Sequence, residues 1–184
     1  TNDTSILPTK ITYSRTGIED MVYTFSYNGN KLVNVTNGFY NKIFTYTGDL
    51  ITSVRSNYGY LVEFGYDANG NLISEKLMNE DGNKSVDDIT YTINGSTVTA
   101  QRIYKVYNKS DGMLYSTITS NITYTLDEKK RPIKYTITSQ KVGEENVNLN
   151  GTCTYSYNNH MSVMQNITGM DKLTYSSVAL GLSY

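Results

Sequence analysis

Apolar and polar residues alternate along most of the chain. Tyr23, Phe25 and Tyr27, for example, stand at every second position, with polar residues between them. A period of two places successive side chains on opposite faces of a half-buried β-strand, whereas a helix repeats about every 3.6 residues. The pattern therefore predicts strands, and no segment of the chain predicts a long helix.

One unit recurs along the chain: a strand that ends in tyrosine, a glycine-containing turn, and a strand that opens with leucine. Tyr27, Tyr46 and Tyr66 end three such strands and stand 19 and 20 residues apart, the length of two strands with their turns. Weaker copies follow at residues 91–98 and 124–133, and a last one at 155–161. Together they predict about six β-hairpins in series.

Short polar returns join the predicted hairpins, and no Pro/Ser-rich linker or charge run interrupts the series. Sequential hairpins of this kind form an antiparallel meander. Twist accumulates over roughly a dozen strands, so such a sheet curls or closes. We therefore expect an all-β chain, a single β-repeat domain over residues 1–184, whose strongly curved sheet is half-barrel or barrel-like. Residues 1–10 are expected to form a flexible amino-terminal segment.

Turn chemistry predicts part of the register. The Asn-Gly pair at residues 28–29 predicts a two-residue turn that places Phe25 opposite Leu32, and the pair at 94–95 predicts the same kind of turn. The last return is expected to be a polar loop over residues 142–151, because glycine and β-branched residues disfavour a helix there.

Composition and charge exclude several classes of function. The formal net charge is -1, so a basic surface for nucleic acid or an anionic membrane is not expected. A single His and a single Cys cannot form a usual zinc site or an internal disulfide. No run of eighteen apolar residues predicts a transmembrane segment. The first residues also lack a signal-peptide pattern, which leaves open a cytosolic protein or an exported one whose signal has been removed.

Candidate catalytic groups are few. His160 and Cys153 are seven residues apart, but a turn near residues 158–159 would place Cys153 opposite residues 162–164 and leave His160 at the tip. We therefore predict a strand cysteine and a solvated turn histidine, and no catalytic, cofactor-binding or metal-binding residues. Residues 67–71 begin like a calcium loop but lack its downstream Glu, so a turn is expected, with its register left open.

Five pairs of adjacent carboxylates stand out in the sequence. Neighbouring residues of a strand point to opposite faces, so none of these pairs forms an obvious general acid/base couple. We expect them in solvated turns: Glu19–Asp20, Glu80–Asp81, Asp87–Asp88, Asp127–Glu128 and Glu144–Glu145.

Tyrosine is the most informative residue type, with 18 copies and no tryptophan. Aromatic pairs across strands stabilise a sheet, which explains many of these residues. Their hydroxyl groups nevertheless need partners or water, so some should lie on a wet face. On a concave face, tyrosine rings can stack on sugar rings while their hydroxyls form hydrogen bonds.

Residues 66–72, Tyr-Asp-Ala-Asn-Gly-Asn-Leu, resemble the Tyr-Asp (YD, or Rhs-type) repeat, with degenerate copies at Tyr27 and Tyr46. Over about residues 8–170 the chain also resembles uncharacterised secreted, often lipid-anchored β-rich proteins of the Bacteroides group. This resemblance implies an exported protein of the cell envelope without known catalysis. It transfers no functional residues.

We therefore expect a non-enzymatic binding or interaction module of the cell envelope, secreted or lipid-anchored through a region outside this chain. Its partner is an unknown protein or glycan at the cell surface. An alternative is a carrier that holds an apolar or glycan ligand in the concave face, to which Met161, Met164 and Met170 would contribute flexible side chains. A third possibility is a structural segment whose edge strands pair with a partner chain. The oligomeric state is left open.

Overall fold

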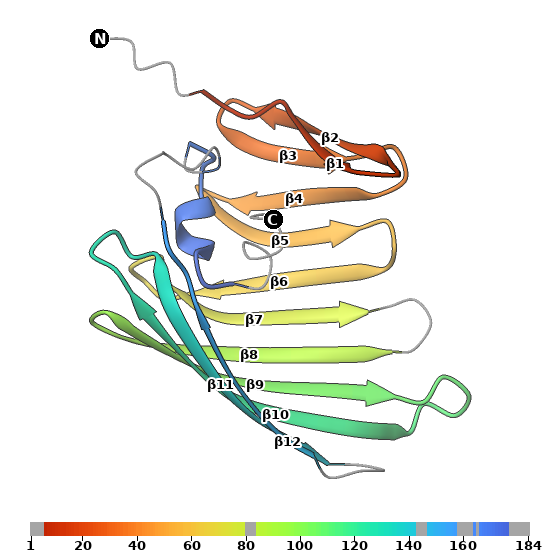
Figure 1. Ribbon diagram of the computed structural model, residues 1–184, viewed down its shortest axis with the longest axis vertical. Coiled ribbons are helices and arrows are strands. Elements are labelled where there is room, and N and C mark those ends of the chain that lie inside the picture. Colours follow the sequence, from red (N-terminus) through yellow and green to blue (C-terminus); the bar gives the residue numbers. More distant parts are fainter. Residues whose placement is uncertain (1–5, 80–83, 143–146, 158–163, 165, 177–184) are drawn as a thin grey trace.

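The computed structural model describes residues 6–79, 84–142, 147–157, 164 and 166–176 of the 184-residue chain. Its strands form one antiparallel sheet in which each strand pairs with the next along the chain (Figure 1). The strands are β1 (Lys10–Arg15), β2 (Ile18–Asn28), β3 (Lys31–Thr36), β4 (Asn41–Thr47), β5 (Leu50–Ser56), β6 (Tyr60–Tyr66), β7 (Leu72–Asn79), β8 (Ser85–Asn94), β9 (Thr97–Tyr107), β10 (Leu114–Leu126), β11 (Pro132–Val142) and β12 (Val147–Thr154), followed by the 3₁₀ helix η1 (Met170–Leu173). The predicted all-β meander is confirmed.

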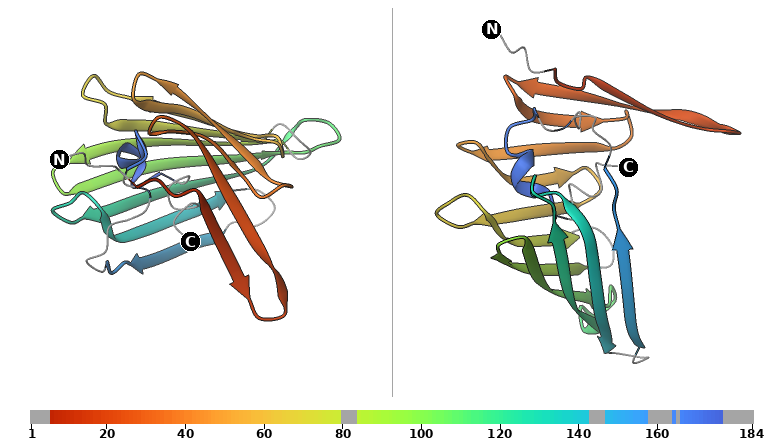
Figure 2. Two further views of the ribbon diagram at one scale, coloured as in Figure 1. Left: turned by 90° about the horizontal axis from the view of Figure 1, so that it is seen from above. Right: turned by 60° about the vertical axis from the view of Figure 1, so that its left-hand side comes forward.

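The sheet is curved and open. β1 and β12 are its two edge strands and do not pair with each other, and the sheet bends around the side that carries η1 (Figure 2). We call this side the inner face. The turns that follow β2, β4, β6, β8 and β10 gather at one end of the strands, the hairpin end, and the other connections gather at the opposite return end (Figure 1).

The predicted register of the first hairpin was wrong by two residues. Tyr27, and not Phe25, lies opposite Leu32, because the two central turn residues are Gly29 and Asn30. Gly29 has φ +59°, so the positive φ falls on the first central residue, as in a type II′ turn. The turn at Gly95 is displaced in the same way. An even displacement leaves the residues between the turn and the first irregularity in pairing on their predicted faces.

A β-bulge recurs just after four hairpin turns. In β3, β5, β7 and β11 the residue after the first buried residue of the strand is an extra one, namely Val33, Thr52, Ile73 and Ile133. The bulge changes the spacing of inward-facing residues from two to three. In β3, for example, both Leu32 and Val35 are buried. The equivalent positions of β7 are Leu72 and Glu75.

One detail of the chain differs from expectation. The return expected over residues 142–151 is mostly strand: β11 extends to Val142 and β12 begins at Val147, paired with β11 in an unbroken register. At the amino terminus, Pro8 and Thr9 of the segment expected to be flexible bind β2, because the Tyr27 hydroxyl donates to Pro8 O and Phe25 N–H donates to Thr9 O.

The hydrophobic core lies between the inner face and residues 166–176, which we call the covering segment. Sheet residues from Phe25 of β2 to Leu126 of β10 form one face of this core. The other face comes from the covering segment, through Ile167, Met170, Leu173 and Tyr175. The sheet is therefore one layer, and the covering segment supplies a partial second layer.

Candidate functional site

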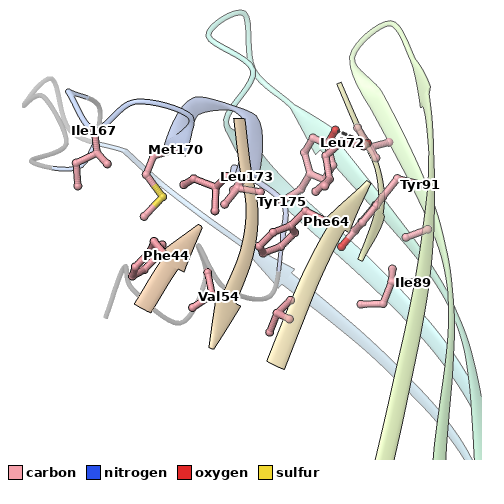
Figure 3. Close-up of a cluster of buried hydrophobic side chains, with 14 of the residues drawn as sticks. Phe44, Val54, Phe64, Leu72, Ile89, Tyr91, Ile167, Met170, Leu173 and Tyr175 are labelled. Atoms are coloured by element: carbon pink, nitrogen blue, oxygen red, sulfur yellow. Dashed lines mark hydrogen bonds between the residues drawn. The ribbon is translucent and has the colours of Figure 1, made fainter. Parts of the chain in front are cut away.

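The covering segment occupies the hairpin end of the inner face. Met170 points toward Phe44, and Tyr175 lies over the strands that carry Phe64 and Leu72 (Figure 3). Gly169 lies close against the sheet: a Cβ atom there would stand 2.7 Å from Asp49 O. This part of the inner face is packed, because Leu72 and Leu173 are fully buried.

Hydrogen bonds tie the covering segment to turns that are distant in the sequence. Thr168 N–H donates to Asn30 O after β2 at 2.9 Å, and the Thr174 hydroxyl donates to Lys130 O after β10 at 3.4 Å. The segment therefore crosses the hairpin end from the β2–β3 turn to the β10–β11 turn.

Tyrosine hydroxyls connect successive repeats to each other. The Tyr46 hydroxyl accepts from Leu32 N–H at 3.1 Å, and the Tyr66 hydroxyl donates to Ile51 O at 2.6 Å. In the next hairpin Ile93 occupies the corresponding position, opposite Val98, and has no hydroxyl. Tyr175 of the covering segment instead donates to Leu72 O at 3.1 Å. Tyr175 of the covering segment thus supplies the hydroxyl that the β8–β9 hairpin lacks.

A second group of tyrosines lies at the return end, away from the covering segment. We call it the tyrosine cluster: Tyr13, Tyr23, Tyr40, Tyr58 and Tyr60. The rings of Tyr13 and Tyr23 meet edge to face with 5.7 Å between centroids, and those of Tyr40 and Tyr58 stack at 5.7 Å and 21°. Burial raises the pKa of Tyr40; its hydrogen bond with Ser56 lowers it, and the nearby phenols of Tyr23 and Tyr60 raise it further.

The cluster is aromatic, partly exposed and carries one cation. Tyr13, Tyr58 and Tyr60 are 41%, 52% and 42% exposed. Lys42 Nζ lies 5.4 Å from the centre of the Tyr40 ring, and burial lowers the pKa of this lysine. Flat ring faces, phenolic hydroxyls and one ammonium group can together form stacking contacts and hydrogen bonds with a polar ring.

Asparagine side chains hold the two returns that carry the cluster. Asn57, before Tyr58, accepts from Asn41 N–H at 3.0 Å and donates to Phe39 O at 2.8 Å. Asn37 accepts from Tyr40 N–H at 2.6 Å. The Asn57 bonds join the β3–β4 and β5–β6 returns, and all three bonds hold the backbone beside Tyr40 and Tyr58.

Two buried carboxylates lie on the inner face between these regions. Glu75, 1% exposed, accepts from the Tyr91 hydroxyl at 3.0 Å. Asp87, 7% exposed, accepts from Arg102 Nε at 2.8 Å and forms an ion pair with its Nη2 at 2.7 Å. The hydrogen bond to Asp87 raises the pKa of Arg102. Since each carboxylate is buried and bonded to a neighbouring side chain, this arrangement favours a structural role over acid/base chemistry.

The two residues weighed for catalysis are not brought together among the described residues. Cys153 lies in β12 opposite Tyr135, half-buried and with a free thiol. His160 and Met161 lie outside the described residues, as does the turn expected near residues 158–159. The Asp67 carboxylate accepts from the N–H groups of Asn69 and Asn71, each at 2.9 Å, and so shapes its own turn.

The carboxylate pairs are only partly in turns. Asp127 lies in a turn that repeats the geometry of Asp67, accepting from Lys129 N–H and Arg131 N–H at 2.9 Å. The expectation was wrong for Glu19–Asp20, which lie in β2, and for Asp87–Asp88, which lie in β8. The pairs at 80–81 and 144–145 lie outside the described residues. In the part of the chain that the structure describes, no three His, Cys, Asp or Glu side chains group as metal ligands.

The sequence reasoning missed two features of the inner face. Met164 and Met170 were read as possible lining for a ligand, yet Met170 is itself buried in the core and Met164 packs beside it. Glu75 was not noticed, although a signal existed: it occupies the position at which the earlier repeats have Val35 and Val54. A carboxylate at a buried valine position indicates a polar partner inside the fold.

Comparison with known proteins shows the fold alone. No family model and no curated protein sequence matches the chain. Among solved structures, the chain is similar to a porin-like protein from Bacteroides vulgatus ATCC 8482, with 19% identity and a TM-score of 0.52. The match covers 72% of this chain and 54% of that one, so this chain corresponds to about half of the solved protein. In the described residues no helix is long and apolar enough to cross a membrane. The chain therefore shares the fold of a β-rich protein from a Bacteroides species.

Proposed function

We propose that the protein is a non-enzymatic binding module of the bacterial cell envelope and that the tyrosine cluster binds a glycan. The observation that carries the proposal is the cluster itself. Its rings are gathered at the return end, next to returns held by asparagine bonds, and several of them are partly exposed. A fold needs no such exposed aromatic group for its own core, and exposed patches of this kind commonly mark binding sites.

Two observations other than the tyrosine cluster support a location at the cell envelope. The solved protein with the same fold is described as porin-like and comes from a Bacteroides species. Residues 66–72 also resemble the YD-type repeat of exported proteins. Both observations support the proposal that the protein belongs to the cell envelope, secreted or lipid-anchored through a region outside this chain.

The carrier alternative places an apolar or glycan ligand in the same concave face. The covering segment fills the hairpin end, so a carried ligand would have to lie toward the return end, near the tyrosine cluster. Native mass spectrometry distinguishes the two functions. A carrier retains a co-purified ligand of a few hundred daltons, on the order of small pocket ligands, whereas a surface module is purified without one.

Binding is tested with an oligosaccharide array, followed by calorimetry of the strongest ligands. Tyr58→Ala removes an exposed ring from the stack with Tyr40, and we expect it to weaken binding by about tenfold or more, about 1.4 kcal/mol. Tyr115→Ala is the matched control, because Tyr115 is 47% exposed and lies in β10, outside the cluster. Binding that is equally affected by both substitutions, or that is found only with protein partners, would contradict the glycan proposal.

The non-enzymatic part of the proposal has its own test. Activity profiling against hydrolase substrates should find no activity that depends on Cys153 or His160. Hydrolysis that is lost in Cys153→Ala or His160→Ala would overturn this part and leave the glycan site to be judged by the binding data.

A further inference from the structure

The two open edges of the sheet differ in how they are protected against pairing with another chain. An edge strand presents unpaired backbone N–H and C=O groups, and proteins block such edges with charges, prolines or bulges. β1 has two of these devices. Lys10 and Arg15 lie at its ends, and its pairing with β2 is interrupted by an irregularity between Tyr13 and Arg15.

β12 has none of these devices. Its eight residues, Val147–Thr154, contain no charged residue and no proline. It pairs with β11 in eight consecutive steps without a register shift. Leu149 is 60% exposed on this strand. Among the described residues β12 pairs only with β11, so a regular, neutral strand edge is left for a partner.

The charges of the two edge strands indicate which of them can pair with a second copy of itself. A strand that pairs antiparallel with its own copy brings its first half opposite its second half. For β1 this would place Lys10 near Arg15 of the partner subunit, and like charges directly opposite are destabilising. For β12 no charges meet. Of the two edges, β12 is the one compatible with self-pairing about a twofold axis.

We propose that β12 pairs antiparallel with β12 of a second copy, with Gly151 at the twofold axis, to join two sheets into one. Alternate residues of β12 lie on one face, so this register places Leu149 opposite Cys153 of the partner subunit on the inner face. Asn150 then lies opposite Thr152 of the partner subunit on the outer face. The proposal is independent of the glycan site, which lies at the other edge of the sheet.

The oligomeric state and two matched charge variants test the pairing. Light scattering after size exclusion should give the mass of a dimer that dissociates on dilution. Asn150→Lys with Thr152→Lys places like charges opposite each other, and we expect the mass to halve while the circular dichroism spectrum is unchanged. Thr12→Lys with Ser14→Lys on β1 is the control and should leave the dimer intact.

A disulfide tests the register. Leu149→Cys should form an interchain disulfide with the natural Cys153, which is too far along the same strand to bond within one chain. Val142→Cys is the control, because Val142 is similarly exposed at 56% but lies in β11. A monomer at every concentration, a dimer that survives the β12 lysines or is lost with the β1 lysines, higher polymers, or equal crosslinking of both cysteine variants would each overturn the proposal.

Discussion

Gly169→Ala is expected to detach the covering segment from the sheet. Gly169 has φ +82°, and an L-residue in this region costs about 1–2 kcal/mol. The new Cβ would also stand 2.7 Å from Asp49 O and 3.2 Å from Ile51 N. Both are backbone atoms next to a hairpin turn, so they cannot rotate away as a flexible side chain could. The covering segment itself must move.

The size of the effect follows from what the movement exposes. The covering segment buries four apolar side chains, those of Ile167, Met170, Leu173 and Tyr175, and each contributes about 1.5–3 kcal/mol when fully buried. Partial loss of this packing, added to the backbone strain, predicts a decrease in the free energy of unfolding of about 3–4 kcal/mol. A typical stability of about 5–15 kcal/mol would leave the variant folded.

Urea denaturation followed by circular dichroism measures this decrease, with Gly70→Ala as the matched control. Gly70 has φ +75°, but a Cβ there meets only Leu50 Cδ2 at 3.7 Å. The control should therefore lose only the backbone strain, about 1–2 kcal/mol. Hydrogen exchange should show faster exchange over residues 166–176 in Gly169→Ala alone. Equal losses in the two variants, with unchanged exchange in this segment, would refute the reasoning.

Three further predictions concern tyrosines and the buried acid. Tyr175→Phe removes the bond to Leu72 O and should lower the free energy of unfolding by about 1 kcal/mol in urea denaturation. Glu75→Val should destabilise because it leaves the buried Tyr91 hydroxyl without this acceptor, and Tyr91→Phe in the same chain should recover most of the loss in a double-mutant cycle. Burial raises the pKa of Tyr27 and Tyr124 to about 12, against about 10 when unfolded. Their stabilising contribution is therefore complete below pH 10 and lost between about pH 10 and 12, which alkaline unfolding followed by tyrosine absorbance would show.

The repeat architecture was predictable because it depends on local chemistry. Alternation and glycine turns each involve a few neighbouring residues, and they identified β2 to β11 in outline. The exact register was not predictable, because Asn28-Gly29 and Gly29-Asn30 are both acceptable turn centres. The bulges were hidden for a similar reason. An extra residue such as Ile73 is as apolar as Leu72 before it, so composition does not mark it as unpaired.

The parts that depend on distant contacts were not predictable. The strand around Cys153 was predicted, but the start of β12 at Val147 was not, because this part has few apolar residues and its strand depends on pairing with β11. The covering segment has no periodic pattern that would place Leu173 or Tyr175 against the sheet. The tyrosine cluster likewise joins Tyr13 and Tyr60, which are far apart in the sequence. The sequence indicated that some tyrosines lie on a wet face, and only the fold shows which ones.

The most direct test of the glycan site is an NMR titration with ¹³C-labelled tyrosine rings. All 18 tyrosines report at once, and single Tyr→Phe variants assign the signals. Oligosaccharides selected on the array should shift the ring signals of Tyr40, Tyr58 and Tyr60 and leave those of Tyr91 and Tyr175 unchanged. Shifts confined to tyrosines outside the cluster, or no shifts at saturating oligosaccharide, would contradict the proposed binding site.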